Sequence, residues 1–259
     1  AKSSNIGMTK IALQLEPNTM TKMYSRLGVG QQMGTGFPGE APGKVPSLKP
    51  AQLIERANVS YGYAMNTTVL QIVQAYAVIA AGGIKRPTTL LKVENPVVGE
   101  KIVDKKFTEQ VKTMLAAVTA AGTGKRARTI SYTVAGKTGT AYKSENGRYS
   151  GKQISSFIGM APVENPRIVA MVVIDEPQGA GTLANGGMVA APAFSKIAED
   201  ALRMLQVPPD APIEQVELVK AYTAKNAKIA ADKAAAKLKA QQEAAKQVAV
   251  PHEEDRPIQ

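Results

Sequence analysis

The sequence contains no cysteine and only one histidine. Without cysteine, the chain has no disulfide, no thiolate metal site and no cysteine nucleophile. The histidine, His252, lies in a polar tail beside Pro251 and Glu253, a setting that favours a solvated residue over a catalytic base. Acid–base chemistry in this chain therefore falls to lysine, a carboxylate or tyrosine.

Long apolar runs are absent as well. No uninterrupted apolar run approaches 18 residues, so no segment of the sequence is suited to spanning a bilayer. The first residues, AKSSNIGM, lack the apolar core of a signal peptide and lead at once into a helical pattern. We expect the chain to be one piece of a longer protein.

Aromatic residues are scarce, whereas positive charge is abundant. Aromatics make up 5% of the chain, and 32 Lys and Arg residues against 21 acidic residues give a net charge of +11. Such a charge favours anionic partners, including nucleic acid, membrane surfaces and acidic cell-wall polymers. The basic residues are scattered apart from residues 125–128 (KRAR), and no aromatic platform accompanies them. We therefore predict no nucleic-acid binding.

The patterning of apolar residues predicts a mixture of helices and strands. With 44% hydrophobic residues in 259, the chain can form one large domain or one domain with appendages. Glycine and proline are dense over residues 28–49, which predicts a loop. The expected helices cover residues 3–16, a short stretch after Pro17, and residues 66–81, 107–122 and 194–205; the expected strands cover residues 88–93, 132–142, 157–161 and 168–174.

The strands cluster late in the chain, with helices before and after them. This order indicates a sheet sandwiched by helices. Residues 168–174 (IVAMVVI) form a continuous apolar run, as expected for a strand covered on both faces.

The C-terminal region has a different composition. From about Glu214, alanine, lysine and glutamine dominate, which predicts a long solvated helix outside the core rather than a partner-binding coiled coil. We expect one domain over residues 1–212 and a helical or disordered extension over residues 213–259. The last nine residues, PHEEDRPIQ, are expected to be disordered, and their acidic residues 253–255 form a charge cluster, not a metal site.

The segment VAGKTGTAYK, residues 134–143, is the most informative in the sequence. Its Gly-Lys-Thr could indicate a phosphate loop, which requires a glycine five residues earlier and a helix afterwards. Ser131 occupies the glycine position, and the intervening residues 132–135 are typical of a strand. The nucleotide interpretation therefore fails on spacing and on context.

A lysine on a strand beside hydroxyl groups suits recognition of a carboxylate. Lys137 supplies positive charge, and Thr138 and Thr140 supply hydroxyl donors. Gly139 removes a side chain so that a ligand backbone can lie against the strand. A main-chain N–H at the end of the tetrad could also face a developing oxyanion, an effect of about 3 kcal/mol in acyl-transfer enzymes. The alternative is an ordinary strand that ends in a turn.

A second motif favours the carboxylate interpretation. Serine-reactive penicillin-binding enzymes combine Ser-x-x-Lys, a Ser-x-Asn-type element and Lys-Thr-Gly. Ser3-Ser4-Asn5 matches the second and opens a helix, and residues 137–139 match the third. Over roughly residues 1–209 the chain resembles the C-terminal part of a class B penicillin-binding protein transpeptidase domain, of the cell-division type. Further matching segments are GFPGE, SYGYAMNTTVLQIVQAYAVIAAGG, SFIGMAPVENPRIVAMVVIDEP and GGMVAAPAFSKIAEDALRML.

The resemblance implies a fold and a role for each matching residue. The fold is of the α/β class, α+β type: an antiparallel sheet sandwiched by helices, with a helical subdomain, incomplete at its N-terminus. The implied catalytic residues are Ser3 in a proton relay, Asn5 on the substrate amide carbonyl and Lys137 in support of the relay. The implied substrate-binding residues are Thr138 and Thr140 on the terminal carboxylate, Gly139 between them, the Thr140 N–H in the oxyanion hole, Tyr63 as a pocket wall and Tyr149 in the loop after the tetrad.

The resemblance also implies an activity, a location and partners. The enzyme would be a serine-type peptidoglycan D,D-transpeptidase of septal wall synthesis, with stem peptides ending in D-Ala-D-Ala as substrates and β-lactams as inhibitors. It needs no cofactor and no metal. Its place would be the periplasmic face of the bacterial inner membrane, held by an anchor outside these residues, among divisome proteins that include a septal glycosyltransferase.

One element of the family pattern is missing. None of the 259 residues begins a Ser-x-x-Lys or a Gly-x-Ser-x-Gly sequence, so we expect this chain alone to be inactive. It could be a fragment or an inactive homologue. The alternatives in function are another penicillin-recognising serine enzyme, such as an elongation-type transpeptidase or a D,D-carboxypeptidase, and a non-catalytic module that binds muropeptides or β-lactams.

Overall fold

The chain forms two compact units. The computed structural model describes residues 2–95, 97–145, 148–179 and 181–248. The first unit spans Ala1–Ala211 and the second spans Pro212–Gln259. All strands lie in the first unit, and the second contains one long helix, α7 (Ile213–Val248).

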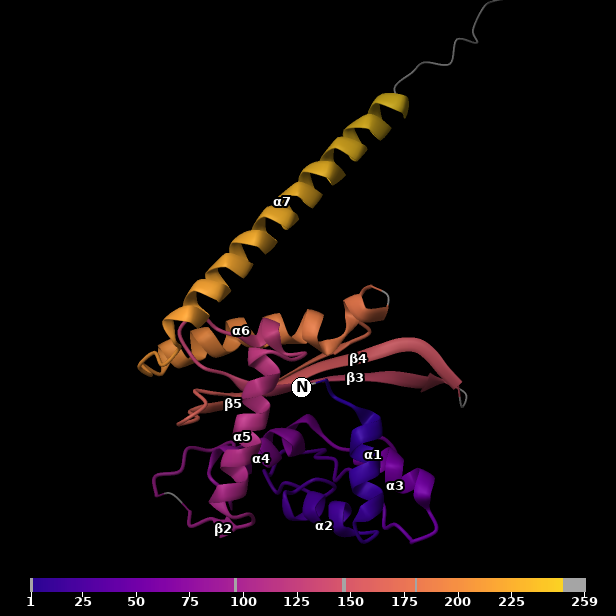
Figure 1. Cartoon of the computed structure of the whole chain (residues 1–259), viewed down its shortest axis with the longest axis vertical. Helices are drawn as coiled ribbons and strands as arrows, with labels where there is room; N and C mark the ends of the chain where they lie inside the picture. The colour runs from indigo at the N-terminus through magenta and orange to yellow at the C-terminus, as the bar shows by residue number, and fades with distance from the viewer. Residues whose placement is uncertain (1, 96, 146–147, 180, 249–259) are drawn as a thin grey trace, which may run out of the picture. The chain divides into compact units, whose positions relative to one another are not determined.

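The first unit combines helices with antiparallel strands, as expected (Figure 1). Its helices are α1 (Asn5–Gln14), α2 (Thr19–Arg26), α3 (Leu53–Ser60), α4 (Val69–Ala80), α5 (Lys105–Ala120) and α6 (Gly186–Met204), with short 3₁₀ turns η1 (Lys125–Ala127) and η2 (Gly181–Ala184). Its strands are β1 (Ile84–Lys85), β2 (Glu100–Lys101), β3 (Ala135–Glu145), β4 (Arg148–Ala161) and β5 (Ile168–Asp175).

The main sheet has the order β3-β4-β5, and both pairs are antiparallel. The register of β3 with β4 is unbroken from the pair Ala135 and Met160 to the pair Tyr142 and Gln153. Helix α6 packs on one face of the sheet, and α4 and α5 pack on the other. Helices α1 to α3 lie on the same side as α4 (Figure 1). The expected sheet between helices is thus confirmed.

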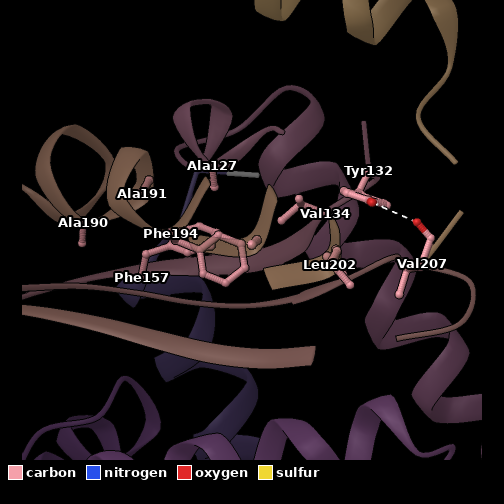
Figure 2. Packing of buried hydrophobic residues seen from close by; sticks show 11 residues of the cluster. Ala127, Tyr132, Val134, Phe157, Ala190, Ala191, Phe194, Leu202 and Val207 are labelled. Carbon is pink, nitrogen blue, oxygen red and sulfur yellow. Dashed lines mark hydrogen bonds between the residues drawn. The ribbon is translucent and has the colours of Figure 1, made fainter. Parts of the chain in front are cut away.

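The core lies between α6 and the sheet (Figure 2). The rings of Phe157 on β4 and Phe194 on α6 are fully buried, with centroids 4.8 Å apart. Small residues let the helix approach the strands closely, because the side chains of α6 around Phe194 include the fully buried Ala190, Ala191 and Ala198. Burying each phenylalanine contributes roughly 2–3 kcal/mol.

Helix α6 also fixes the chain that leads into β3. The buried Glu199 carboxylate accepts hydrogen bonds from the Ile130 and Ser131 N–H groups, both at 3.0 Å, and from the Ser131 hydroxyl at 2.6 Å. Burial alone would raise the pKa of Glu199, but these bonds, with one from Arg203, outweigh it and hold the pKa below its ordinary value. Because the ionised form is stabilised, this anchor persists at neutral pH.

The segment after α6 closes over the same region. The Tyr132 hydroxyl donates to the Val207 carbonyl at 2.9 Å (Figure 2). The Asp210 carboxylate accepts the Thr133 N–H at 2.7 Å, and the Asp210 N–H donates to the Ser131 carbonyl at 3.0 Å. Residues 130–133, which lead into β3, are therefore held by hydrogen bonds both from α6 and from the segment that follows it.

The loop over residues 28–49 is ordered by one side chain of α4. Gln71 is fully buried. Its amide donates to the carbonyls of Gln31 at 2.6 Å and Pro42 at 2.8 Å, and its oxygen accepts the Gly30 N–H at 3.1 Å. These bonds, with the antiparallel main-chain bridge between Lys44 and Asn66, satisfy polar groups of a loop that contains no regular strand.

The prediction of a strand over residues 88–93 is wrong. The segment forms no strand, and the Leu91 N–H donates to the Thr89 hydroxyl at 3.0 Å in a local turn. A threonine hydroxyl can satisfy nearby main-chain groups and so compete with a sheet ladder. Leu90 and Leu91 are 64% and 80% exposed, so their apolar character did not indicate burial.

Most other elements agree with the predictions in kind and differ in their ends. Strand β5 contacts both α6 and α4, but its side chains are half-buried or exposed rather than fully covered, with Val173 39% exposed. Strand β4 begins at Arg148, nine residues before the predicted start, and α3 was not predicted. From Lys220 onward every described side chain of α7 is exposed, as expected for a solvated helix. His252, the acidic residues 253–255 and the predicted disorder of the C-terminus lie outside the described residues.

Ala64 has a left-handed main chain, with φ of +57°. This conformation costs a residue with a Cβ roughly 1–2 kcal/mol, whereas glycine adopts it freely. The larger entropy of glycine in the unfolded state offsets part of this relief. Ala64→Gly should therefore raise the free energy of unfolding by only about 0.5–1 kcal/mol, measured by urea denaturation. The control Ala117→Gly, on the exposed side of α5, should lower it by about 1 kcal/mol. A loss of stability in Ala64→Gly would contradict the strain.

Candidate functional site

A cavity of about 990 Å³ opens between the N-terminal end of α1, the turn after α3 and the outer edge of β3. It brings together Ser3, Asn5, Lys137, Thr138, Gly139, Thr140 and Tyr63, seven of the eight residues singled out in the sequence. Residues 3 and 140 are far apart in the chain, so only the fold unites them. The remaining lining residues are Ser4, Gly7, Met8, Ile11, Asn58, Ser60, Tyr61 and Tyr142.

The first wall of the cavity is the start of α1. The Ser4 hydroxyl accepts the Gly7 N–H at 3.1 Å and caps the helix. Ser3, just before this cap, has a left-handed main chain with φ of +52°. A non-glycine residue in this region stores strain of about 1–3 kcal/mol, and such residues gather at functional sites.

Arg56 holds α1 in place. Most side chains of α1 are exposed, and Ala12 is its one buried residue. The guanidinium of Arg56, on α3, is buried and donates to the carbonyls of Ala12 at 3.4 Å, Leu13 at 3.3 Å and Leu15 at 2.7 Å. A cation at a helix C-terminus is favourable because the last carbonyls lack helical partners. Arg56 therefore fixes the helix whose other end carries Ser3 and Asn5.

The second wall is β3, where Lys137 is half-buried. Its Nζ donates to the Thr138 carbonyl at 2.8 Å. Burial lowers the pKa of Lys137 below its ordinary value, because the charged ammonium loses hydration. A partly desolvated ammonium interacts strongly with an anion and also gives up its proton more readily than a surface lysine.

The two threonines of the tetrad face the start of α6. The hydroxyl oxygens of Thr138 and Thr123 lie 2.8 Å apart, and the Thr140 hydroxyl accepts the Gly186 N–H at 3.2 Å. Gly186 is the first residue of α6, whose N-cap is Asn185. Helix N-termini carry partial positive charge, so α6 adds to the attraction of this strand for an anion.

Glycine at position 139 has a reason within the sheet. A Cβ there would lie 2.4 Å from the hydroxyl oxygen of Ser156, the partner residue on β4. Contacts this short do not occur, so a side chain at position 139 would displace Ser156. The absence of a side chain thus relieves a contact inside the protein, in addition to the ligand clearance expected from the sequence.

The two tyrosines singled out in the sequence are placed differently. Tyr63 lines the cavity, and its ring meets that of Tyr61 edge to face with centroids 5.8 Å apart. The main chain of Tyr149 pairs with Ser144 near the end of the β3–β4 hairpin, and its side chain lies outside the described part.

Sequence reasoning missed Arg56, Tyr61, Tyr142 and Thr123. Strand alternation could have found Tyr142, which lies two residues after Thr140 on the same strand face. No local signal could have found Arg56 or Thr123, because their partners are distant in the chain. Within the described ranges no group of three or more metal-binding side chains occurs, and no helix is long and apolar enough to cross a bilayer.

Comparison with known proteins identifies what this chain is similar to. The penicillin binding protein transpeptidase domain family matches residues 1–199. The chain is 38% identical over 221 residues to the probable peptidoglycan D,D-transpeptidase PenA of Neisseria flavescens, covering 85% of this chain and 55% of that protein. It is 40% identical over 212 residues to the peptidoglycan D,D-transpeptidase FtsI of Escherichia coli K12, covering 81% of this chain and 36% of that protein.

A solved structure of a penicillin-binding protein transpeptidase domain is also similar to this chain. The transpeptidase domain of penicillin-binding protein 3 from Burkholderia pseudomallei superposes with a TM-score of 0.75 at 42% identity, covering 81% of this chain and 64% of that one. The chain thus spans between about a third and about half of the length of the curated relatives described above.

Replacing Arg56 should test its hold on α1. Arg56→Met removes the guanidinium from three carbonyls of the α1 terminus, of which, among the described residues, only that of Ala12 keeps another donor, the Leu15 N–H. We therefore expect the free energy of unfolding to fall by about 2–4 kcal/mol in urea denaturation. Arg86→Met removes an exposed guanidinium and serves as the matched control, with a change within about 0.5 kcal/mol. Equal effects of the two substitutions would contradict the assignment.

The lowered pKa of Lys137 predicts a pH-dependent stability. The unfolded chain keeps this proton up to the ordinary value of 10.5, whereas the folded chain releases it at lower pH. Between these two pKa values the unfolded state binds more protons, so the cost of burying the charge, fully present at lower pH, is relieved as pH rises. Lys137→Met removes this cost, so the variant should have a higher free energy of unfolding than the unsubstituted chain. This difference should shrink as the pH rises from 7 to 10.5. A constant difference would show that the pKa is not lowered.

Proposed function

Because the chain belongs to the penicillin-binding protein transpeptidase family, we propose that it forms the substrate-binding part of a peptidoglycan D,D-transpeptidase. Its ligands are stem peptides ending in D-Ala-D-Ala, and β-lactams that mimic them. The observation that carries the proposal is the single cavity in which the Ser-x-Asn element of α1 faces the Lys-Thr-Gly-Thr strand. The relatives named peptidoglycan D,D-transpeptidases support it.

The geometry of the cavity supports a separate role in acyl transfer for each of these residues. Thr138 and Thr140, with Lys137 and the N-terminus of α6, bind the terminal carboxylate of the peptide. The Thr140 N–H stabilises the oxyanion that forms on the penultimate D-Ala carbonyl. The Asn5 side-chain amide donates a hydrogen bond to the substrate amide carbonyl and positions it. Ser3 with Lys137 relays protons to the leaving D-Ala.

The nucleophile of this reaction is a serine of a Ser-x-x-Lys segment, which these 259 residues do not contain. That serine attacks the penultimate D-Ala carbonyl and forms an acyl-enzyme with loss of the last D-Ala. The amine of a neighbouring stem peptide then takes the acyl group and completes the cross-link. The chain supplies binding and electrostatic stabilisation and not the attacking group.

The cellular role follows from the same resemblance. We infer septal wall synthesis at the periplasmic face of the inner membrane, with divisome proteins and a septal glycosyltransferase as partners. The similarity to a relative named FtsI supports this choice over an elongation-type enzyme. A fluorescent fusion of the longer protein concentrated along the side wall rather than at the septum would contradict it.

Covalent labelling by fluorescent penicillin tests the activity. A protein that joins this chain to its upstream Ser-x-x-Lys segment should be labelled, whereas the chain alone should not be, because it lacks the nucleophile. In the joined protein, Asn5→Ala should lower the second-order rate of labelling about tenfold, as expected for the loss of one substrate hydrogen bond. Asn95→Ala, at an exposed position outside the cavity, is the control and should label normally.

Two results would sink the proposed function. One is a joined protein, folded by circular dichroism, that fails to react with penicillin. The other is labelling of the chain alone at Ser3 or Ser4, which would make the Ser-x-Asn element itself the nucleophile.

A further inference from the structure

The outer edge of β3 is the surface along which an extended ligand can pair. The sheet order places β3 at the edge, with β4 on its other side. In an antiparallel strand, successive residues direct their main-chain N–H and C=O groups alternately to the two sides. The register with β4 is unbroken from Ala135 to Tyr142, so Thr138, Thr140 and Tyr142 share one direction.

Two hydrogen bonds to side chains show that these main-chain groups point outward, away from β4. The same bonds occupy the edge of β3 at two positions. The Tyr142 N–H donates to the Tyr63 hydroxyl at 3.5 Å, away from β4. The Thr138 carbonyl accepts the Lys137 Nζ at 2.8 Å. Thr140 lies between these two capped positions, and among the described residues none bonds to its outward main-chain groups.

Tyr63 is held firmly enough to act as a cap. Its N–H donates to the Asn58 carbonyl at the end of α3, at 2.9 Å. Its ring packs edge to face on Tyr61, whose own hydroxyl donates to the Asn58 side chain at 2.6 Å. The residues on either side, Gly62 and Ala64, both have left-handed main chains, with φ of +95° and +57°. This turn directs Tyr63 at β3 even at the cost of strain in Ala64.

The roles proposed above set the direction of a bound peptide. With the terminal carboxylate at Thr138 and the scissile carbonyl at the Thr140 N–H, the residues that precede the scissile bond continue along β3 towards Tyr142. The next outward donor that they would meet is the Tyr142 N–H, which the Tyr63 hydroxyl already occupies.

We propose that Tyr63 is a specificity-determining residue that stops the peptide register on β3: its hydroxyl confines main-chain pairing of the ligand to Thr140. This inference rests on the proposed function. Strand addition to a long open edge permits slipped registers, because every second residue offers the same donor and acceptor. Capping the position after Thr140 removes the slipped alternative and keeps one carbonyl at the oxyanion position.

Removing the Tyr63 hydroxyl should therefore lengthen the usable edge. The test compares the 259-residue chain with its Tyr63→Phe variant, using N-acetyl-D-Ala-D-Ala and the longer N-acetyl-Gly-L-Lys-D-Ala-D-Ala as probes in calorimetry. The unsubstituted chain should bind both with similar Kd. In Tyr63→Phe the longer probe should bind about fivefold more tightly than the shorter one, as expected for one gained hydrogen bond.

A second readout needs no ligand. Amide hydrogen exchange at Tyr142, followed by NMR, should accelerate about fivefold in Tyr63→Phe, because the amide loses its acceptor, while exchange at Gly136 within the β3–β4 pairing stays unchanged. Tyr24→Phe is the matched control, since it deletes a tyrosine hydroxyl that donates to the Val59 carbonyl outside the cavity. It should leave both the Kd ratio and the Tyr142 exchange rate as they are.

The outcomes separate this inference from the proposed function. The register stop is overturned if the two probes differ in Kd by the same factor in Tyr63→Phe as in the unsubstituted chain, or if Tyr24→Phe shows the same change as Tyr63→Phe. If neither probe binds to any variant, both the proposed function and the register stop are contradicted. The exchange rate then still shows whether the Tyr63 hydroxyl caps the Tyr142 N–H. An unchanged Tyr142 exchange rate overturns the cap itself.

Discussion

The one-sided pairing of β3 is the constraint on which the site depends. Strand β3 bonds to β4 along one edge and leaves its other edge to the cavity, so the same main chain that builds the sheet also presents the Lys-Thr-Gly-Thr tetrad. Its stability comes from behind, where the Phe157 and Phe194 rings and the small residues of α6 form the core. The hydrogen bonds of Glu199 and Asp210 fix the chain as it enters the strand. Rigid support behind an open edge is what a binding strand requires.

The opposite wall is built on a different principle. Helix α1 buries little surface, and a single guanidinium holds its C-terminal end. Its N-terminal end presents Ser3 in a strained conformation, next to a cap that is satisfied within the helix. Precision at this wall therefore depends on directional hydrogen bonds more than on apolar packing, so substitutions distant from the cavity, such as at Arg56, bear on the position of Ser3 and Asn5.

Local patterns predicted the elements that obey them. The 3.6-residue period predicted α4 and α5, and the apolar run of residues 168–174 predicted β5, which contacts α6 and α4. The failures have physical causes: a threonine turn replaced the strand expected over residues 88–93, and α3 directs Arg56 inward while Ile54 is 74% exposed, which inverts the expected pattern. Two short motifs and a family resemblance predicted seven residues that the fold brings to one cavity. The partners of Tyr63 and Arg56 could not be predicted, because long-range contacts set them.

The hydrogen bond from the Gly186 N–H to the Thr140 hydroxyl makes the cavity favour anionic, hydrogen-bond-accepting groups over cationic ones. A hydroxyl has one proton and two lone pairs, and the main chain of α6 already uses a lone pair of this one. What Thr140 has left to offer most readily is its proton, so it selects ligand groups that accept and disfavours ammonium groups, which only donate. The helix dipole and the Lys137 ammonium act in the same direction. For the proposed peptide ligand, this preference favours the C-terminal carboxylate over the N-terminal ammonium, independently of the peptide's side chains.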